Sequence, residues 1–234
     1  MFYCRFLFIQ INIDEVLKIW YHYKISLRLI GEDITMGAIL ALGVRAVGIL
    51  VALTLHEFSR ALTSTILGDK KPKKDGRLTL NPIKHFEPIG FILCFASGFG
   101  WGKPVETTAL YYKNRKAGTL ITALVPSLVN LLVAFVCGVL SSTLNLKSEL
   151  LIVFLYYIVH YNVFLAVYNL IPVSPMDGLK VLSVVLPANK YFEYLQHEKM
   201  VQMVFLIMLF MGYVGVLISP VASGIMSVFL GISW

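Results

Sequence analysis

Residues 117–146 read AGTLITALVPSLVNLLVAFVCGVLSSTLNL and contain no Asp, Glu, Lys or Arg. A transmembrane helix needs about 20 mostly apolar residues, so this stretch is long enough to cross a bilayer. Two further stretches also lack these four residue types: residues 150–176, with only His160 inside, and residues 200–234. Because one chain carries several such stretches, we predict an all-α polytopic membrane protein.

The composition of the whole chain supports a membrane location. Of its 234 residues, 58% are hydrophobic and 14% are charged, whereas soluble domains carry about 25% charged residues. Three cysteines without paired spacing give neither a disulfide framework nor a zinc ribbon. The composition argues against a soluble enzyme or a soluble DNA-binding domain, and we expect no nucleic-acid partner.

The basic residues predict how the spans are oriented. Clusters of Lys and Arg stand at both ends of residues 69–116, the connection that leads to residues 117–146. Since basic loops face the cytoplasm, we expect an integral protein of the plasma membrane with residues 69–116 in the cytoplasm. The formal net charge of +7 is then loop charge rather than a nucleic-acid surface.

Residues 36–68 form a fourth apolar stretch, but this one carries ionisable side chains. They are Arg45, His56, Glu57 and Arg60. Ionisable groups are expensive inside a membrane and mark a functional site by default. In the orientation above, His56 and Glu57 share one half of the membrane with Asp177, which follows residues 150–176.

Two shorter features affect the number of spans. Residues 88–102 are uncharged, short and rich in glycine, which predicts a β-hairpin or a re-entrant segment that reaches Pro104. A hairpin there could offer an edge strand to an unwound peptide. Ser219-Pro220 predicts a break within residues 200–234, and we therefore expect about 4–6 transmembrane helices.

Residues 1–35 fit this arrangement poorly. They show no clean helical or alternating period, and their basic residues favour a cytoplasmic start. One interpretation is that Met36 is the natural start and that residues 1–35 are an N-terminal extension. The other is an amphipathic surface segment. In both interpretations we expect one membrane domain over residues 36–234.

Residues 56–60 read HEFSR and lie within the charged span. In a His-Glu-x-x-His helix, two imidazoles stand one turn apart and hold zinc, while the glutamate acts as general base. The fifth position here is Arg60 rather than histidine, so the pattern alone is a weak signal. It gains weight because neither His56 nor Glu57 is placed in a membrane without cost.

Further motifs follow in order along the chain. They are GRLTLNPIKH at 76–85, PIG at 88–90, WGKPV at 101–105, Pro126 and Asn130 within residues 117–146, and YNLIPVSPMDG at 168–178. This ordered set resembles the site-2 protease family of intramembrane zinc metalloproteases over residues 36–186. The resemblance implies zinc as cofactor and hydrolysis of a substrate's transmembrane helix within the lipid bilayer. The expected partner is a transmembrane helix of a membrane-protein substrate or partner.

The resemblance also assigns roles to individual residues. It implies that His56 is the first zinc ligand and that Glu57 is the catalytic base or acid. Asp177 would be the carboxylate ligand from the distant span. Asn81 and Asn169 match polar positions expected to bind substrate. Each asparagine also has a structural interpretation, because Asn81 precedes a proline and can start a turn, and Asn169 can cap a helix end.

Arg60 is the main departure from the family pattern. A guanidinium stays protonated in proteins and has no lone pair for a metal, and catalytic zinc usually has three protein ligands. Three alternatives follow. Arg60 replaces the metal and pairs with Asp177 and Glu57; or His85 serves as the third ligand; or Arg60 turns away and leaves a weak two-ligand site. The first predicts a non-catalytic pseudoprotease that binds membrane proteins, the second predicts a site that keeps zinc, and the third predicts an altered site.

Overall fold

The computed structural model of the chain describes residues 34–98, 100–144 and 146–231. This part of the chain is helical and contains no strand. The chain divides into two units, residues 1–43 and residues 44–234, and every contact discussed below lies within the second unit. Apart from its last two residues, the predicted extension over residues 1–35 lies outside the described residues.

Four of the described helices are long and apolar enough to cross a membrane. They are α2 (Ile34–Ile66), α6 (Arg115–Thr143), α7 (Glu149–Tyr168) and α11 (Tyr213–Leu230). They coincide with the apolar stretches in the sequence, because a backbone in lipid must satisfy its own hydrogen bonds. The prediction of an all-α polytopic membrane protein is confirmed.

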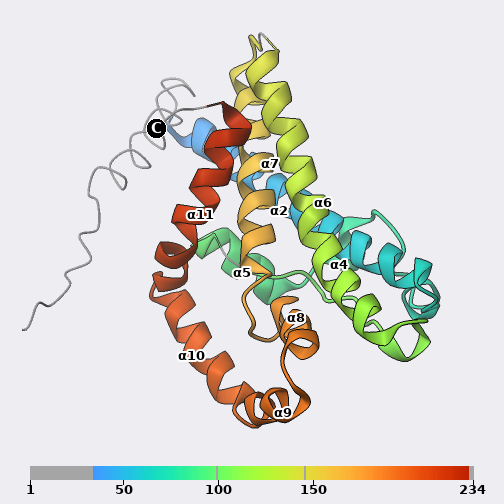
Figure 1. Ribbon diagram of the computed structural model, residues 1–234. Coiled ribbons are helices and arrows are strands. Elements are labelled where there is room, and N and C mark those ends of the chain that lie inside the picture. The colour runs from blue at the N-terminus through green and yellow to red at the C-terminus, as the bar shows by residue number, and fades with distance from the viewer. Residues whose placement is uncertain (1–33, 99, 145, 232–234) are drawn as a thin grey trace, which may run out of the picture. The chain divides into compact units, whose positions relative to one another are not determined.

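The core of the second unit forms around α6 and α7, which lie side by side, and α11 packs against both (Figure 1). A Cβ atom on Gly138 of α6 would lie 2.5 Å from the carbonyl oxygen of Phe229 in α11. Small residues allow helix backbones to approach this closely in membranes. Within the second unit, the part of α2 from residue 44 onward runs across α6 and α7 rather than alongside them, and its buried Ile49 and Leu53 belong to the same core.

Residues 88–97 form a short helix, α5 (Pro88–Ser97), so the β-hairpin alternative is wrong. The sequence supplies both ends of this helix. The Glu87 side chain accepts a hydrogen bond from the Gly90 amide, and Gly98 ends the helix with φ 83°. Its ten residues are too few to span a bilayer, yet its Cys94 is buried in the core. The re-entrant alternative therefore fits the structure.

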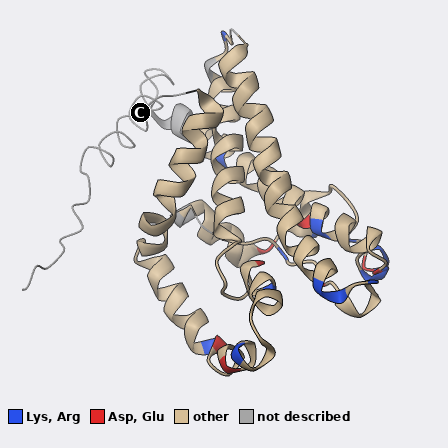
Figure 2. Ribbon diagram, viewed as in Figure 1, with Lys and Arg blue, Asp and Glu red and all other residues tan. Residues whose placement is uncertain are grey.

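Short helices occupy the connections between the long ones. α3 (Lys71–Lys74), α4 (Pro82–His85) and η1 (Ala109–Tyr111) lie, with α5, between α2 and α6. α8 (Gly178–Val185), α9 (Ala188–Gln196) and α10 (Glu198–Phe210) lie between α7 and α11. Most of the charged residues gather in these connections, and the long helices are largely uncharged (Figure 2).

The C-terminal stretch breaks at a different place from the predicted one. α10 ends at Phe210, and Gly212 separates it from α11 with φ 79°. Glycine adopts a positive φ without steric cost, which explains why the chain turns there. Pro220 lies inside α11, so the predicted break at Ser219-Pro220 is wrong.

Candidate active site

Helix α2 brings three ionisable residues together as one buried group. His56 and Arg60 stand one helical turn apart on the same face, next to Glu57. The exposed fraction is 2% for His56 and Arg60 and 4% for Glu57. Because buried polar and charged groups are costly without partners, each of these side chains needs a hydrogen-bond partner inside the protein.

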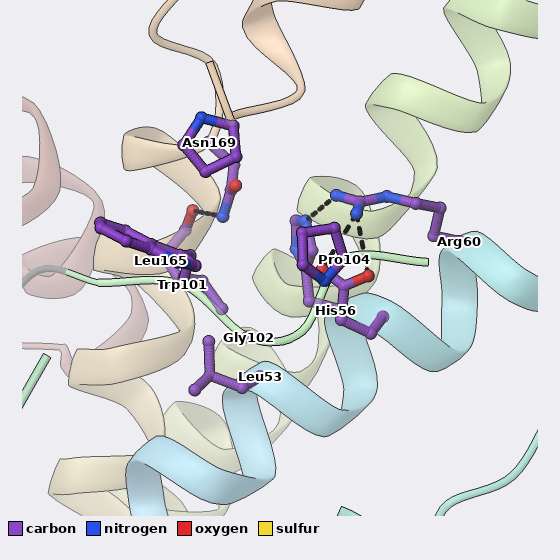
Figure 3. Close-up of a pocket in the computed structure, with 10 residues that line it drawn as sticks. Leu53, His56, Arg60, Trp101, Gly102, Pro104, Leu165 and Asn169 are labelled. Carbon is purple, nitrogen blue, oxygen red and sulfur yellow. Dashed lines mark hydrogen bonds and ion pairs between the residues drawn. The ribbon is translucent and has the colours of Figure 1, made fainter. Parts of the chain in front are cut away.

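The Arg60 guanidinium is at the centre of this group (Figure 3). Its Nη1 donates to both carboxylate oxygens of Glu57, at 3.0 and 2.8 Å. Its Nη2 donates to Oδ2 of Asp177 at 2.5 Å. Asp177 is fully buried and lies directly before α8. Arg60 thus joins two acids from distant parts of the chain through charge-assisted hydrogen bonds.

His56 is held between Asp177 and the middle of α6. Its Nε2 lies 3.0 Å from Oδ2 of Asp177 and 3.1 Å from Nη2 of Arg60. Its Nδ1 lies 3.1 Å from Oδ1 of Asn130. Asn130 in turn donates to Oδ1 of Asn162 in α7, at 2.8 Å. Both asparagines have no exposed surface, so a continuous polar network fixes the imidazole in the apolar core.

Asp177 accepts contacts from a second cation as well. The ammonium of Lys180 lies 3.3 Å from Oδ1 of Asp177. Burial alone would raise the pKa of the Asp177 carboxyl, but the charge of Arg60 and the hydrogen bond with His56 hold that pKa well below its usual range. Asp177 is therefore an anion at neutral pH, and the two cations Arg60 and Lys180 compensate for the two acids Glu57 and Asp177.

A small cavity of about 10 Å³ opens beside these side chains, with room for about one water molecule. Figure 3 shows it between α2 and an extended segment, with Trp101, Gly102 and Pro104 on one side and Asn169 on another. The amide of Lys103 donates to the carbonyl of His85, and that of Val105 to Oε2 of Glu57. These two amides are therefore already used within the protein and are not free for strand pairing.

Comparison with known proteins gives one family. Residues 34–212 match Peptidase family M50. This chain belongs to peptidase family M50. It is 30% identical over 168 residues, 68% of this chain and 77% of the relative, to a Bacillus subtilis (strain 168) protein named "Putative zinc metalloprotease YwhC". No solved structure matches the chain. The resemblance to the site-2 proteases is confirmed.

Membership of the M50 family implies zinc, but the residues present do not fit that ion. His56 and Asp177 converge, as two ligands should. The third position holds Nη2 of Arg60, within 3.1 Å of both ligand atoms, and a guanidinium has no lone pair to donate. Among the described residues, no three His, Cys, Asp or Glu side chains form a group that could hold a metal.

The other residues implied by the M50 resemblance fall in two places. Asn169 lines the cavity, and its amide also donates to the carbonyl of Leu165 at 2.9 Å. Asn81 is exposed, and its side chain caps α4 by accepting from the amide of Ile83 at 3.0 Å. The structure therefore brings Asn169, and not Asn81, to the cavity.

His85 is buried, but the structure does not bring it to His56 and Asp177 as a third ligand. Its Nε2 lies 2.7 Å from the carbonyl of Thr79, and its Nδ1 lies 3.4 Å from Nη2 of Arg77. Burial lowers the pKa of His85. The hydrogen bond to Thr79 raises that pKa, and the positive charge of Arg77 lowers it further. The imidazole of His85 thus binds the loop after α3, while its backbone carbonyl accepts from Lys103 in the segment beside the cavity.

Asn130 and Asn162 are site residues to which the sequence assigned no role, although Asn130 stands among the residues that carry the family resemblance. Their network depends on the packing of α6 against α7. A signal was nevertheless present, because an amide side chain in the middle of an uncharged span needs an interhelical partner.

We expect Gly90→Ala to destabilise the segment beside the cavity. A Cβ atom on Gly90 would lie 2.0 Å from the carbonyl oxygen of Trp101, and such overpacking costs about 1–3 kcal/mol. The free energy of unfolding in mixed micelles measures the effect. Gly224→Ala in α11 is the matched control, because its Cβ meets no atom within 4 Å. Equal stability of the two variants would contradict this packing.

Proposed function

We propose that this chain binds transmembrane segments of other membrane proteins without cutting them, with Arg60 in the place of the M50 zinc ion. The observation that supports the proposal is the position of Nη2 of Arg60, 3.1 Å from Nε2 of His56 and 2.5 Å from Oδ2 of Asp177. A cation between His56 and Asp177 repels a metal ion. It also compensates for the negative charge of the acids that would otherwise face the metal.

The contacts of Glu57 support the same proposal. A general base needs a free lone pair within reach of the water that it deprotonates. Oε1 of Glu57 accepts from Arg60, and Oε2 accepts from both Arg60 and the amide of Val105. Both oxygens of the carboxylate therefore already accept hydrogen bonds from groups that stay protonated. This arrangement favours an ion pair with Arg60 over proton transfer to or from water.

A family member that has lost cleavage would still have the surface that recognises a transmembrane segment. Trp101, Pro104 and Leu165 give the cavity apolar walls, and Asn169 adds a polar group. These residues come from the extended segment and from the end of α7, which do not depend on a metal for their placement. We propose further that the protein resides in the plasma membrane with residues 69–116 in the cytoplasm, since this connection carries the basic clusters.

The test is to measure binding and cleavage on the same sample. The purified chain is reconstituted in lipid vesicles with a fluorescent transmembrane peptide that has a helix-breaking Gly-Pro pair near its middle. We expect saturable binding by energy transfer and an intact peptide by mass spectrometry. Cleavage that disappears in Glu57→Gln would overturn the proposal and favour the alternative of a retained peptidase. Absence of any binding would overturn it as well.

A further inference from the structure

Arg45 is a cation in α2 that the candidate active site does not use. It lies eleven residues before His56 in the same helix. Its Nε donates to the hydroxyl of Tyr161 in α7 at 2.5 Å, and its guanidinium carbon lies 5.1 Å from the ring centre of Phe95 in α5. Three helices of the second unit therefore contribute to the surroundings of this one charge.

The position of Tyr161 in α7 places this cation well inside the membrane. Tyr161 lies twelve residues after Glu149 and seven residues before Tyr168, the two ends of the helix. At about 1.5 Å per residue these separations are roughly 18 and 10 Å. Because the hydrocarbon core is about 30 Å thick, the charge of Arg45 lies away from both lipid headgroup layers.

The contacts that the structure gives Arg45 within the described residues are with neutral groups. Within residues 34–98, 100–144 and 146–231, no carboxylate forms an ion pair with Arg45. A phenol and a phenyl ring stabilise a guanidinium only in part. Arg60 forms a clear contrast, because the same helix provides that cation with two carboxylates. Ionisable residues inside membranes are usually paired, and they indicate a functional site by default.

We propose that Arg45 recognises an acidic side chain, Asp or Glu, in the middle of the transmembrane helix that this chain binds. The inference rests on the proposed function and adds the chemical class of the partner. A guanidinium presents five N–H donors, and Nε alone donates to Tyr161. The terminal nitrogens suit a carboxylate, which they can bind in the bidentate geometry. A partner helix supplies that carboxylate at the right depth, whereas a lipid phosphate stays at the headgroup level.

The experiment compares three alanine–leucine transmembrane peptides in phosphatidylcholine vesicles. One carries Asp at its centre, one carries Asn there, and one carries Asp one turn from its end. We expect the central Asp peptide to bind at least about tenfold more tightly than the other two. Arg45→Gln should abolish this preference, and Lys147→Gln, which removes an exposed loop cation, should leave it unchanged.

Arg45→Lys separates a binding role from a structural one. It retains the charge, so we expect it to retain a preference for the central Asp even if Arg45→Gln fails to fold. Equal binding of the Asp and Asn peptides by the wild-type chain, or a preference that persists in Arg45→Gln, would overturn the proposal. Loss of binding to anionic vesicles in Arg45→Gln, without any Asp preference in wild type, would assign Arg45 to lipid phosphate and overturn it too.

The same measurement distinguishes failure of this inference from failure of the proposed function. If the Asn peptide binds intact and as tightly as the Asp peptide, the chain is a binding protein and Arg45 does not select its partner. If the peptides are cleaved, the proposed function is wrong. The ratio of the affinities for the Asp and Asn peptides still shows whether Arg45 selects an acidic side chain.

Discussion

The variant Arg60→His is expected to bind about one zinc ion per chain, while the wild-type protein binds none. Histidine at position 60 stands one turn from His56, on the face that meets Asp177. Removal of the guanidinium takes away the cation that lies within 3.1 Å of both retained ligand atoms. Three protein ligands then face one point, which is the number that catalytic zinc uses. Metal analysis of the purified protein measures the stoichiometry.

The controls for this prediction separate the active site from adventitious histidine binding. Lys70→His adds an imidazole on an exposed loop and should bring no zinc. Adding Asp177→Ala to Arg60→His should remove the metal again. Zinc at one ion per wild-type chain, lost in Asp177→Ala, would show that Arg60 does not replace the metal.

The second large effect is expected for Asp177→Ala in the otherwise unchanged chain. This substitution leaves the buried Arg60 with one of its two acids, and Lys180 with none. Breaking a buried ion pair from one side costs about 3–5 kcal/mol, because an uncompensated charge stays in the interior. Equilibrium unfolding in mixed micelles measures the loss. Glu193→Gln, which breaks the exposed pair with Lys190, should produce no measurable change.

A combined variant tests whether charge is the cause of that loss. Arg60→Met alone should be strongly destabilising, because it strands the carboxylates of Glu57 and Asp177. Adding Glu57→Gln and Asp177→Asn removes those charges, and neutral replacements of buried ion pairs are often well tolerated. We therefore expect the triple variant to be more stable than Arg60→Met. A further decrease in stability would show that packing, rather than charge, holds the site together.

The sequence predicts the parts of this molecule that depend on local physics. Long uncharged stretches become helices because the bilayer permits little else, and the spans over residues 117–146 and 150–176 appear as α6 and α7. Pairing of Arg60 with Asp177 and Glu57 was one of three alternatives from the sequence. It is the arrangement that the structure has, since guanidinium and carboxylate attract strongly in an apolar interior.

The errors arise where local signals compete. Glycines near residue 100 suggested a hairpin, but Pro88 and the Glu87 cap favour a helix at the start of that segment. Pro220 suggested a break, but an apolar helix in a membrane tolerates proline, and Gly212 turns the chain instead. The network of Asn130 and Asn162 depends on which faces of α6 and α7 meet, and hydrophobicity alone does not specify those faces.

The cation at the centre of this site is the side chain of Arg60, so it is present as soon as the chain has folded. With Arg60 between Glu57 and Asp177, the charge of the site is balanced by side chains of the chain itself, and the proposed function needs no step in which a metal is loaded. Zinc depletion and chelators, which disable a metalloprotease, leave such a protein as it was. Under the proposed function, we therefore expect binding of a transmembrane segment to persist at zinc concentrations too low to load a zinc-dependent relative.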